Sequence, residues 1–319
     1  MTVIVGSGNS KIGTVQSNAY LDRTESLAYK QVALMVMGET IDIPSYQAEV
    51  HTLRSYDEIS ISNALLTPLN ENVLNAERIE TVTGSLVTMR TSEYGVTIVI
   101  SEKSRVNSPE NIAAAVSTLL SDYEMRLKET IIYNALQNSN LVEYVFTQGG
   151  TTSPKKANIN DLIDASTLME ENDVRPNLSF IPAASEEYTR SIPHRYALVA
   201  SIKGASSIKK NLLGDDFTQT HRFAGISAYG FECKGAIERA NLEVFSSSEM
   251  EDGSGIEREA FIFGAQPFYL TGRTPLNSRM TIRPASESTY AMHTKVEKRT
   301  VFGVALSNQN RIMKISFSD

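Results

Sequence analysis

The stretch Glu93-Tyr94-Gly95-Val96-Thr97-Ile98-Val99-Ile100-Ser101 places an apolar side chain at every second position. This period of two predicts a strand with one buried face, in which Gly95 fits a β-bulge. Shortly after it, Ser108-Pro109-Glu110 supplies the N-cap, the first-turn proline and the acid that open a helix. The apolar residues that follow recur about every 3.6 positions and predict a helix of about 30 residues, about 45 Å long. They are Ile112, Val116, Leu119, Leu120, Tyr123, Leu127, Ile131 and Ala135.

The exposed side of this helix is expected to carry two i,i+4 ion pairs, Glu124 with Lys128 and Asp122 with Arg126. Upstream, Thr24 to Met37 suggests a short helix or apolar arm, and Glu39 to Pro44 alternates like a strand that ends at proline. The next strand signal begins near Ile79 and continues through Met89.

Between these strands, Ser45 to Arg78 shows no sustained period, which is unusual for a connection inside a compact domain. We interpret it as a projecting arm. Its leucines, Leu65, Leu66 and Leu69, have little of the arm's own core to pack against, so a second subunit is expected to bury them. A disordered loop is the alternative.

Downstream, a Gly-, Thr- and Ser-rich break at Thr147 to Lys156 suggests a domain boundary. Asn158 begins a predicted helix that is followed by Arg175-Pro176. The remaining predictions are a strand at 178–182, a helix at 185–190, a loop at 202–214, and strands at 217–231, 242–245, 260–263 and 279–283. The last two strands, Val301 to Leu306 and Arg311 to Phe317, are predicted to form a hairpin around 307–310.

Composition excludes several classes of protein. The chain has 319 residues, a net charge of -7 and 41% hydrophobic residues, and its sequence shows neither a membrane span nor a secretory signal, so a soluble cytoplasmic protein is expected. The net charge disfavours a dedicated nucleic-acid binder, and Lys203, Lys209 and Lys210 are expected in a solvated basic loop. A mildly acidic subunit is nevertheless compatible with a container for DNA.

No chemistry emerges from the candidate motifs. The lone Cys233 is expected as a small buried residue, and the four histidines lack ligand spacing, so no metal is assigned. The glycines of Val3 to Gly8 resemble a dinucleotide fingerprint, but Lys11 replaces the third glycine. The segment Gly8 to Thr14 lacks the lysine of a phosphate loop, and the adjacent acids Glu186 and Glu187 point apart. We expect no catalytic residue and no cofactor.

The order of these elements resembles the major capsid proteins of tailed bacteriophages, and most of all the family from short-tailed phages related to enterobacterial phage N-four. The residues that carry the resemblance occur along nearly the whole chain: Leu21-Asp22-Arg23, Gly38 to Pro44, Glu93 to Ser101, Ile163 to Leu168, Arg175-Pro176-Asn177, Gly225 to Phe231, Phe263-Gly264-Ala265 and Thr300 to Leu306.

The resemblance implies an α+β fold of the Hong Kong 97 type. It implies an N-terminal arm at 1–37, an extended-loop hairpin at 38–104, a peripheral domain with the long spine helix at 105–153 and 259–319, and an inserted axial domain at 154–258. It further implies self-assembly into hexamers and pentamers of a virion shell that encloses double-stranded DNA without sequence-specific binding, with assembly in the bacterial cytoplasm. Portal and scaffolding or cement proteins would be partners, and no membrane is involved.

Some shells of this fold cross-link a loop lysine to an asparagine of another subunit, but residues 39–102 contain no lysine. Non-covalent assembly is therefore expected, with Arg54, Leu65, Leu66, Leu69 and Arg78 at contacts between subunits. The alternatives are an encapsulin-like nanocompartment, a tail-tube or sheath subunit and, from a different class, a cytoplasmic α/β enzyme with an unrecognised site.

Overall fold

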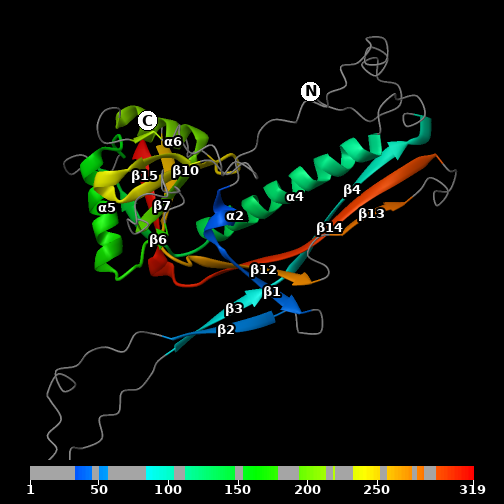
Figure 1. Ribbon diagram of the computed structural model, residues 1–319, viewed down its shortest axis with the longest axis horizontal. Helices are drawn as coiled ribbons and strands as arrows, with labels where there is room; N and C mark the ends of the chain where they lie inside the picture. Colours follow the sequence, from blue (N-terminus) through cyan, green and yellow to red (C-terminus); the bar gives the residue numbers. More distant parts are fainter. Residues whose placement is uncertain are drawn as a thin grey trace, which may run out of the picture.

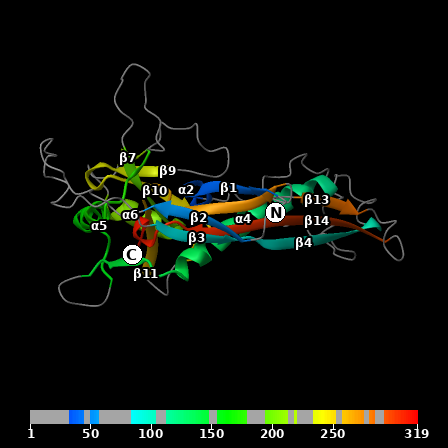
Figure 2. The ribbon, with the colours of Figure 1, turned by 90° about the horizontal axis from the view of Figure 1, so that it is seen from below.

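A computed structural model of the protein gives an elongated molecule, with a compact lobe at one end and a ribbon of strands extending from it beside one long helix (Figures 1 and 2). The structure describes residues 33–44, 50–56, 84–103, 112–147, 154–178, 194–212, 218–219, 233–251, 257–274, 279–283 and 292–319. Predictions made for residues between these ranges lie outside the described residues.

The ribbon is a five-stranded sheet with β14 (His293–Leu306) at its centre. Along one side, β14 pairs antiparallel with the whole of β4 (Ser92–Ser101), the strand that the alternating stretch predicts. Along the other side, β12 (Phe268–Thr274) pairs with the end of β14, and β13 (Arg279–Arg283) pairs with its beginning. The predicted strand β1 (Glu39–Pro44) adds to β12 in parallel.

The long helix α4 (Ile112–Gln137) uses two different faces along its length. In its first half, Val116 and Leu120 pack on Ile100 and Val296 of the ribbon. In its second half, the buried side chains Ile132, Tyr133 and Leu136 belong to a separate core that includes strands of the lobe. At about 100° per residue these two sets lie on roughly opposite sides of the helix. A single apolar stripe through Tyr123 is therefore wrong, and Tyr123 is 43% exposed.

The lobe contains an eight-stranded mixed sheet in the order β5, β15, β11, β7, β10, β9 and β8, with β6 added to β7. These strands are β5 (Val142–Val145), β6 (Asn177–Leu178), β7 (His194–Ser201), β8 (Thr218–Gln219), β9 (Cys233–Ile237), β10 (Leu242–Ser247), β11 (Glu257–Phe263) and β15 (Ile312–Ser318). The sheet thus joins segments that the sequence analysis places in different domains.

Each face of the lobe sheet has its own apolar core. One face packs on α5 (Ile159–Glu171) and α6 (Ile202–Asn211), through side chains such as Leu162, Met169 and Ile208. The other face packs on the second half of α4, on β12 and on the one-turn helix α2 (Leu34–Met37). The lobe and the ribbon therefore share one continuous apolar contact through α4.

The two lobe helices begin with side-chain caps. The Asn158 side chain accepts a hydrogen bond from the Asp161 N–H at 3.0 Å, which confirms the predicted start of α5. The Ser201 hydroxyl accepts from the Gly204 N–H at 3.0 Å and opens α6. The loop predicted at 202–214 is therefore wrong over 202–211, and Lys203, Lys209 and Lys210 lie on a helix.

The hairpin predicted at the C-terminus is also wrong. Both strands exist, but β14 belongs to the ribbon and β15 pairs with β11 and β5 in the lobe. The short 3-10 turn η4 (Gln309–Arg311) carries the chain from one sheet to the other. A second 3-10 turn, η2 (Glu238–Ala240), joins β9 to β10. The bulge predicted at Gly95 is absent from the described β4–β14 ladder, whose register is continuous there.

The predicted arm contains a strand that the sequence analysis missed. This strand, β2 (Val50–Tyr56), pairs antiparallel with β3 (Gly84–Arg90), and the two form a separate two-stranded sheet (Figure 1). The end of β3 crosses close to β14, where a Cβ added to Gly303 would lie 2.2 Å from the Arg90 carbonyl oxygen. Glycine at 303 therefore permits this close crossing.

Candidate functional site

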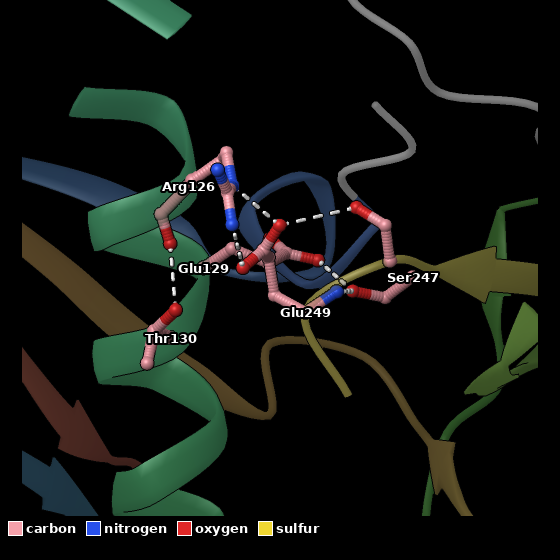
Figure 3. Close-up of polar contacts among 6 residues, drawn as sticks. Arg126, Glu129, Thr130, Ser247 and Glu249 are labelled. Atoms are coloured by element: carbon pink, nitrogen blue, oxygen red, sulfur yellow. Dashed lines mark hydrogen bonds and ion pairs between the residues drawn. The ribbon is translucent and has the colours of Figure 1, made fainter. Parts of the chain in front are cut away.

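A dense polar arrangement surrounds the buried carboxylate of Glu129 on α4 (Figure 3). Its Oε1 accepts hydrogen bonds from the backbone N–H groups of Ala33 and Leu34, each at 2.8 Å. The other oxygen, Oε2, accepts from the Met35 N–H at 3.1 Å. The Ser247 hydroxyl, at the end of β10, donates to Oε1 at 2.8 Å. One carboxylate thus joins α2, α4 and the lobe sheet.

Burial dominates the electrostatics of this carboxylate. Glu129 is 0% exposed, and desolvation raises its pKa, although the hydrogen bonds from Leu34, Ser247, Ala33 and Met35 act in the opposite direction. Oε1 accepts three of these hydrogen bonds and Oε2 accepts one. The group is therefore suited to hold chain segments together, because its donors come from the α2 segment and from the end of β10.

An ion pair lies beside the Glu129 carboxylate, on the exposed side of α4. Arg126 donates from Nε to Oε1 of Glu249 at 2.7 Å and from Nη2 to Oε2 at 3.3 Å. The Glu249 backbone N–H in turn donates to the Ser247 hydroxyl at 3.3 Å, and Thr130 donates to the Arg126 carbonyl at 2.9 Å (Figure 3). A bidentate pair of this kind fixes orientation as well as distance. It fastens α4 to the loop after β10.

The first half of α4 is fastened to the ribbon by a similar device. Glu124, predicted on the exposed side, is buried and pairs with Lys128 at 2.7 Å and with Lys298 of β14 at 2.9 Å. The Thr300 hydroxyl lies 3.2 Å from the same carboxylate. The predicted ion pair between Glu124 and Lys128 is confirmed. The prediction that Glu124 lies on the exposed side of the helix is wrong. Each half of α4 thus carries one buried glutamate that ties it to the sheet beneath.

Four of the exposed large apolar residues lie on the β2–β3 hairpin and on β13. On the β2–β3 hairpin, Leu86 is 64% and Val50 is 49% exposed. On β13, Ile282 is 50% and Met280 is 42% exposed. A two-stranded hairpin is marginally stable by itself, and apolar side chains on it are typical of a contact surface.

The residues predicted at contacts between subunits fall largely outside the described ranges. Arg54 lies on β2 and is the register partner of Leu86 on β3. Leu65, Leu66, Leu69 and Arg78 belong to 57–83, outside the described residues. Their contacts remain predictions.

The other residues that the sequence analysis considered are dispersed. His51, His194 and His293 lie on three different strands, β2, β7 and β14, and Cys233 begins β9. Within the described ranges, no group of three or more His, Cys, Asp or Glu side chains is placed to hold a metal ion. No helix in the described part of the chain combines the length and the hydrophobicity that crossing a membrane requires.

Sequence reasoning missed Glu129 and misplaced Glu124. A signal for Glu129 exists in the sequence, because it precedes Ile132 and Tyr133 by three and four positions and so shares their helix face. An acid on an apolar helix face needs buried donors. The donors themselves are backbone N–H groups about 95 residues away, which no local pattern identifies.

Comparison with models of known protein families gives no match, and no curated protein sequence matches the chain. Solved structures do match over nearly its whole length. The capsid of Ralstonia phage GP4 superposes with a TM-score of 0.63 at 13% identity, covering 100% of this chain and 98% of that chain. The head structure of Helicobacter pylori bacteriophage KHP40 gives a TM-score of 0.63 at 10% identity, covering 99% and 98%.

The capsid structure of the Cyanophage P-SCSP1u matches with a TM-score of 0.60 at 8% identity, covering 96% of this chain and 94% of that chain. The matches cover each partner almost completely in both directions, so they compare whole subunits with whole subunits. The chain therefore has the mixed α+β fold of phage capsid and head proteins.

Proposed function

We propose that the chain is the major capsid protein of a tailed bacteriophage, which self-assembles into the hexamers and pentamers of an icosahedral head that encloses double-stranded DNA. The observation that carries this proposal is the match, from end to end, to capsid chains of several phages at TM-scores of 0.60 to 0.63. The polar junctions at Glu124 and Glu129 are consistent with it, because they join parts of the subunit to one another.

We further propose a correspondence between the two sheets and the domains of the Hong Kong 97 type. The lobe with the eight-stranded sheet would be the axial domain, and the five-stranded ribbon with α4 would be the peripheral domain. The β2–β3 hairpin would belong to the extended loop at 38–104, and residues 1–37 would form the N-terminal arm. The axial domain predicted at 154–258 would then also include β5, β11 and β15, since these strands lie in its sheet.

The extended loop would lie over a neighbouring subunit. The exposed Leu86 and Val50 support this, and Arg54, Leu65, Leu66, Leu69 and Arg78 are the proposed contacts. Replacing Leu65, Leu66 and Leu69 together by serine should reduce assembly while the isolated subunit stays folded. Unchanged assembly of this triple variant would remove the arm's leucines from the interface.

Assembly through this loop would be non-covalent, because residues 39–102 offer no lysine for a cross-link. Mechanical strength would come from burial, interlocking arms or a cement protein. Boiling assembled particles in SDS with reductant should yield a single monomer band, and a ladder of covalent oligomers would contradict this part of the proposal.

The remaining parts of the proposal follow from a shell protein. The chain would act without catalysis, cofactor or metal, and its partners would be other copies of itself, a portal, and scaffolding or cement proteins. It would be made in the bacterial cytoplasm and reside in the virion, enclosing DNA without reading its sequence. Relationship to short-tailed phages of the N-four group rests on the motif resemblance along the sequence.

The decisive experiment is light scattering with negative-stain electron microscopy on the full chain expressed alone and together with the neighbouring genes of its genome, at near-physiological and at high salt. Closed shells, pentamers or hexamers are the expected result. Helical tubes would favour a tail-tube or sheath subunit. A chain that remains a monomer or dimer under all these conditions, and binds a metabolite, would favour the enzyme alternative.

A further inference from the structure

The β13–β14 ladder places like charges directly opposite one another at two positions. Its register pairs Arg279 with Arg299 and Arg283 with Lys295. Residues that are direct partners in an antiparallel ladder project on the same face of the sheet, and like charges in such pairs are destabilising. The ribbon therefore concentrates four cations on one face of two short stretches of strand.

This basic face is the one turned away from α4. On β14, Val296 is buried against Val116 and Leu120 of the helix. Side chains alternate along a strand, so residues at odd numbers, including 295 and 299, point to the opposite side. All four cations are exposed. We refer to Arg279, Arg283, Lys295 and Arg299 together as the basic face.

Neutralisation of the basic face within the subunit is incomplete. Arg283 pairs with Glu297 at 3.0 Å, and Arg299 pairs with Glu93. Within the described part of the chain, no ion pair is found for Arg279 or Lys295. The face thus carries four cations against two anions, in an arrangement that costs stability in the isolated subunit and would be relieved by an anionic partner.

One segment of the chain has the complementary charge. Residues 57–83, between β2 and β3, contain Asp57, Glu58, Glu71, Glu77 and Glu80 against the single base Arg78. If it were extended outward and back, the same segment could reach up to about 45 Å beyond β2 and β3, because about 13 residues would lead each way. The basic face and the acidic segment are both parts of this sequence.

Within one subunit, the strands that flank the acidic segment, β2 and β3, do not lead toward the basic face. Figure 1 shows the open end of the β2–β3 hairpin, at Tyr56 and Gly84, directed away from the end of the ribbon that carries β13. A contact between them is therefore expected between different copies of the chain. The partner it fits is a second copy, since duplex DNA binding rests on more extensive phosphate neutralisation than a net excess of two cations supplies.

We propose that the basic face receives the acidic segment 57–83 of a neighbouring copy. This inference rests on the proposed function and specifies the surface on which the extended loop docks. It assigns the like-charge pairs of β13 and β14 a role in assembly, because the contact supplies the anions that the subunit itself lacks.

The test is the double charge reversal Arg279→Glu/Lys295→Glu in the full chain, with assembly measured on nuclease-treated subunits by sedimentation and electron microscopy. The reversal turns each like-charge pair into an opposite-charge pair, so the thermal midpoint of the unassembled subunit should stay the same or rise. The yield of closed shells should nevertheless fall at least tenfold. Combining the reversal with Glu71→Lys/Glu77→Lys in the same chain should restore at least half of the wild-type yield.

The matched control is Lys156→Glu/Lys210→Glu, which makes the same change of net charge at two exposed lysines of the lobe. This control should assemble at close to the wild-type yield. Wild-type assembly by Arg279→Glu/Lys295→Glu would overturn the inference while leaving the proposed function intact. Equal losses in variant and control, or normal shells that only hold less DNA in cells, would overturn it as well. Failure of the wild type to form shells would instead count against the proposed function.

Discussion

Removing the Glu129 carboxylate should release the segment that precedes the ribbon. In the variant Glu129→Ala, three backbone N–H groups and the Ser247 hydroxyl lose their acceptor at once. Ala33 and Leu34 are 1% and 0% exposed, so water cannot replace the lost carboxylate while α2 remains docked. The chain then either keeps buried, unpaired donors or lets α2 detach.

The magnitude follows from comparing these two routes. Keeping α2 docked leaves two fully buried donors unpaired, at about 1 to 3 kcal/mol each. Detaching α2 exposes Leu34 and Met37, which are 0% and 5% exposed, at about 1.5 to 3 kcal/mol for each side chain. Removing a buried charge offsets part of either cost. The expected loss of unfolding free energy is therefore about 2 to 4 kcal/mol.

Urea denaturation of the unassembled subunit, together with hydrogen exchange, measures both consequences. The amides of Ala33, Leu34 and Met35 should lose protection in Glu129→Ala, while amides in the middle of α4 keep theirs. Glu124→Ala is the matched control, because it removes a buried glutamate of the same helix that contacts Lys128 and Lys298 instead of α2. It should destabilise the subunit without changing exchange at 33–35.

A Glu129→Ala subunit that stays within about 0.5 kcal/mol of the wild type and retains protection at these three amides would contradict the prediction, since ordinary surface substitutions cost as little. Equal loss of protection at the amides of residues 33–35 in Glu124→Ala would contradict the prediction as well. In that case the docking of α2 would depend on global stability and not on the carboxylate that accepts its N–H groups.

Three further predictions concern single positions. Gly303→Ala should cost about 1 to 3 kcal/mol by chemical denaturation, because its Cβ would meet the Arg90 backbone, whereas Gly95→Ala, whose Cβ would lie 3.7 Å from the Lys298 carbonyl oxygen, should be neutral or slightly stabilising. Tyr196→Phe should cost about 1 to 2 kcal/mol in thermal unfolding, because the buried Tyr196 hydroxyl donates to the Val174 carbonyl at 2.7 Å and the carbonyl would lose that donor. Burial raises the pKa of Glu129 in the folded state. As the pH rises from the ordinary glutamate pKa through the raised one, the unfolding free energy of the wild type should therefore fall relative to that of Glu129→Gln. A wild type that gains stability relative to Glu129→Gln over this pH range would contradict the prediction.

Elements with a strong local signal could be predicted from the sequence. The alternation of Tyr94, Val96, Ile98 and Ile100 places one face of β4 on α4, and the observed burial follows that alternation. The cap at Asn158 gives the start of α5 within one residue. In both cases the information lies within a few neighbouring residues.

Elements whose signal is weak or ambiguous were missed. The buried side of α6 consists mainly of small residues, Gly204, Ala205 and Ser207 with Ile208, so its periodicity is faint beside three lysines. The central lobe strand β7 is an unbroken apolar run, Tyr196 to Ala200, because both faces of its sheet are covered. Such a run lacks the period that identifies a half-exposed strand.

The candidate site also combines a feature that the sequence predicts with contacts that it does not. That α4 is a helix could be predicted, but the partners of its glutamates could not, since Glu129 contacts Ala33 and Ser247, which lie about a hundred residues away on either side. The projecting arm was predicted from its lack of period, yet the strand β2 inside it was missed. Its side chains alternate only weakly, and its pairing with β3 depends on residues far along the chain.

The position of α4 between the lobe and the ribbon explains why its two faces differ. A helix that lay on one sheet would carry one stripe, but α4 packs its first half on the ribbon and its second half on the lobe. The buried Glu124 fixes the first contact and Glu129 the second, each with partners on the sheet it meets. Breaking either carboxylate contact should therefore loosen one sheet from the helix while the other stays attached. The angle between lobe and ribbon would then vary. In the shell proposed for this chain every copy must keep the same range of angles, so such variants should form irregular particles before they fail to fold.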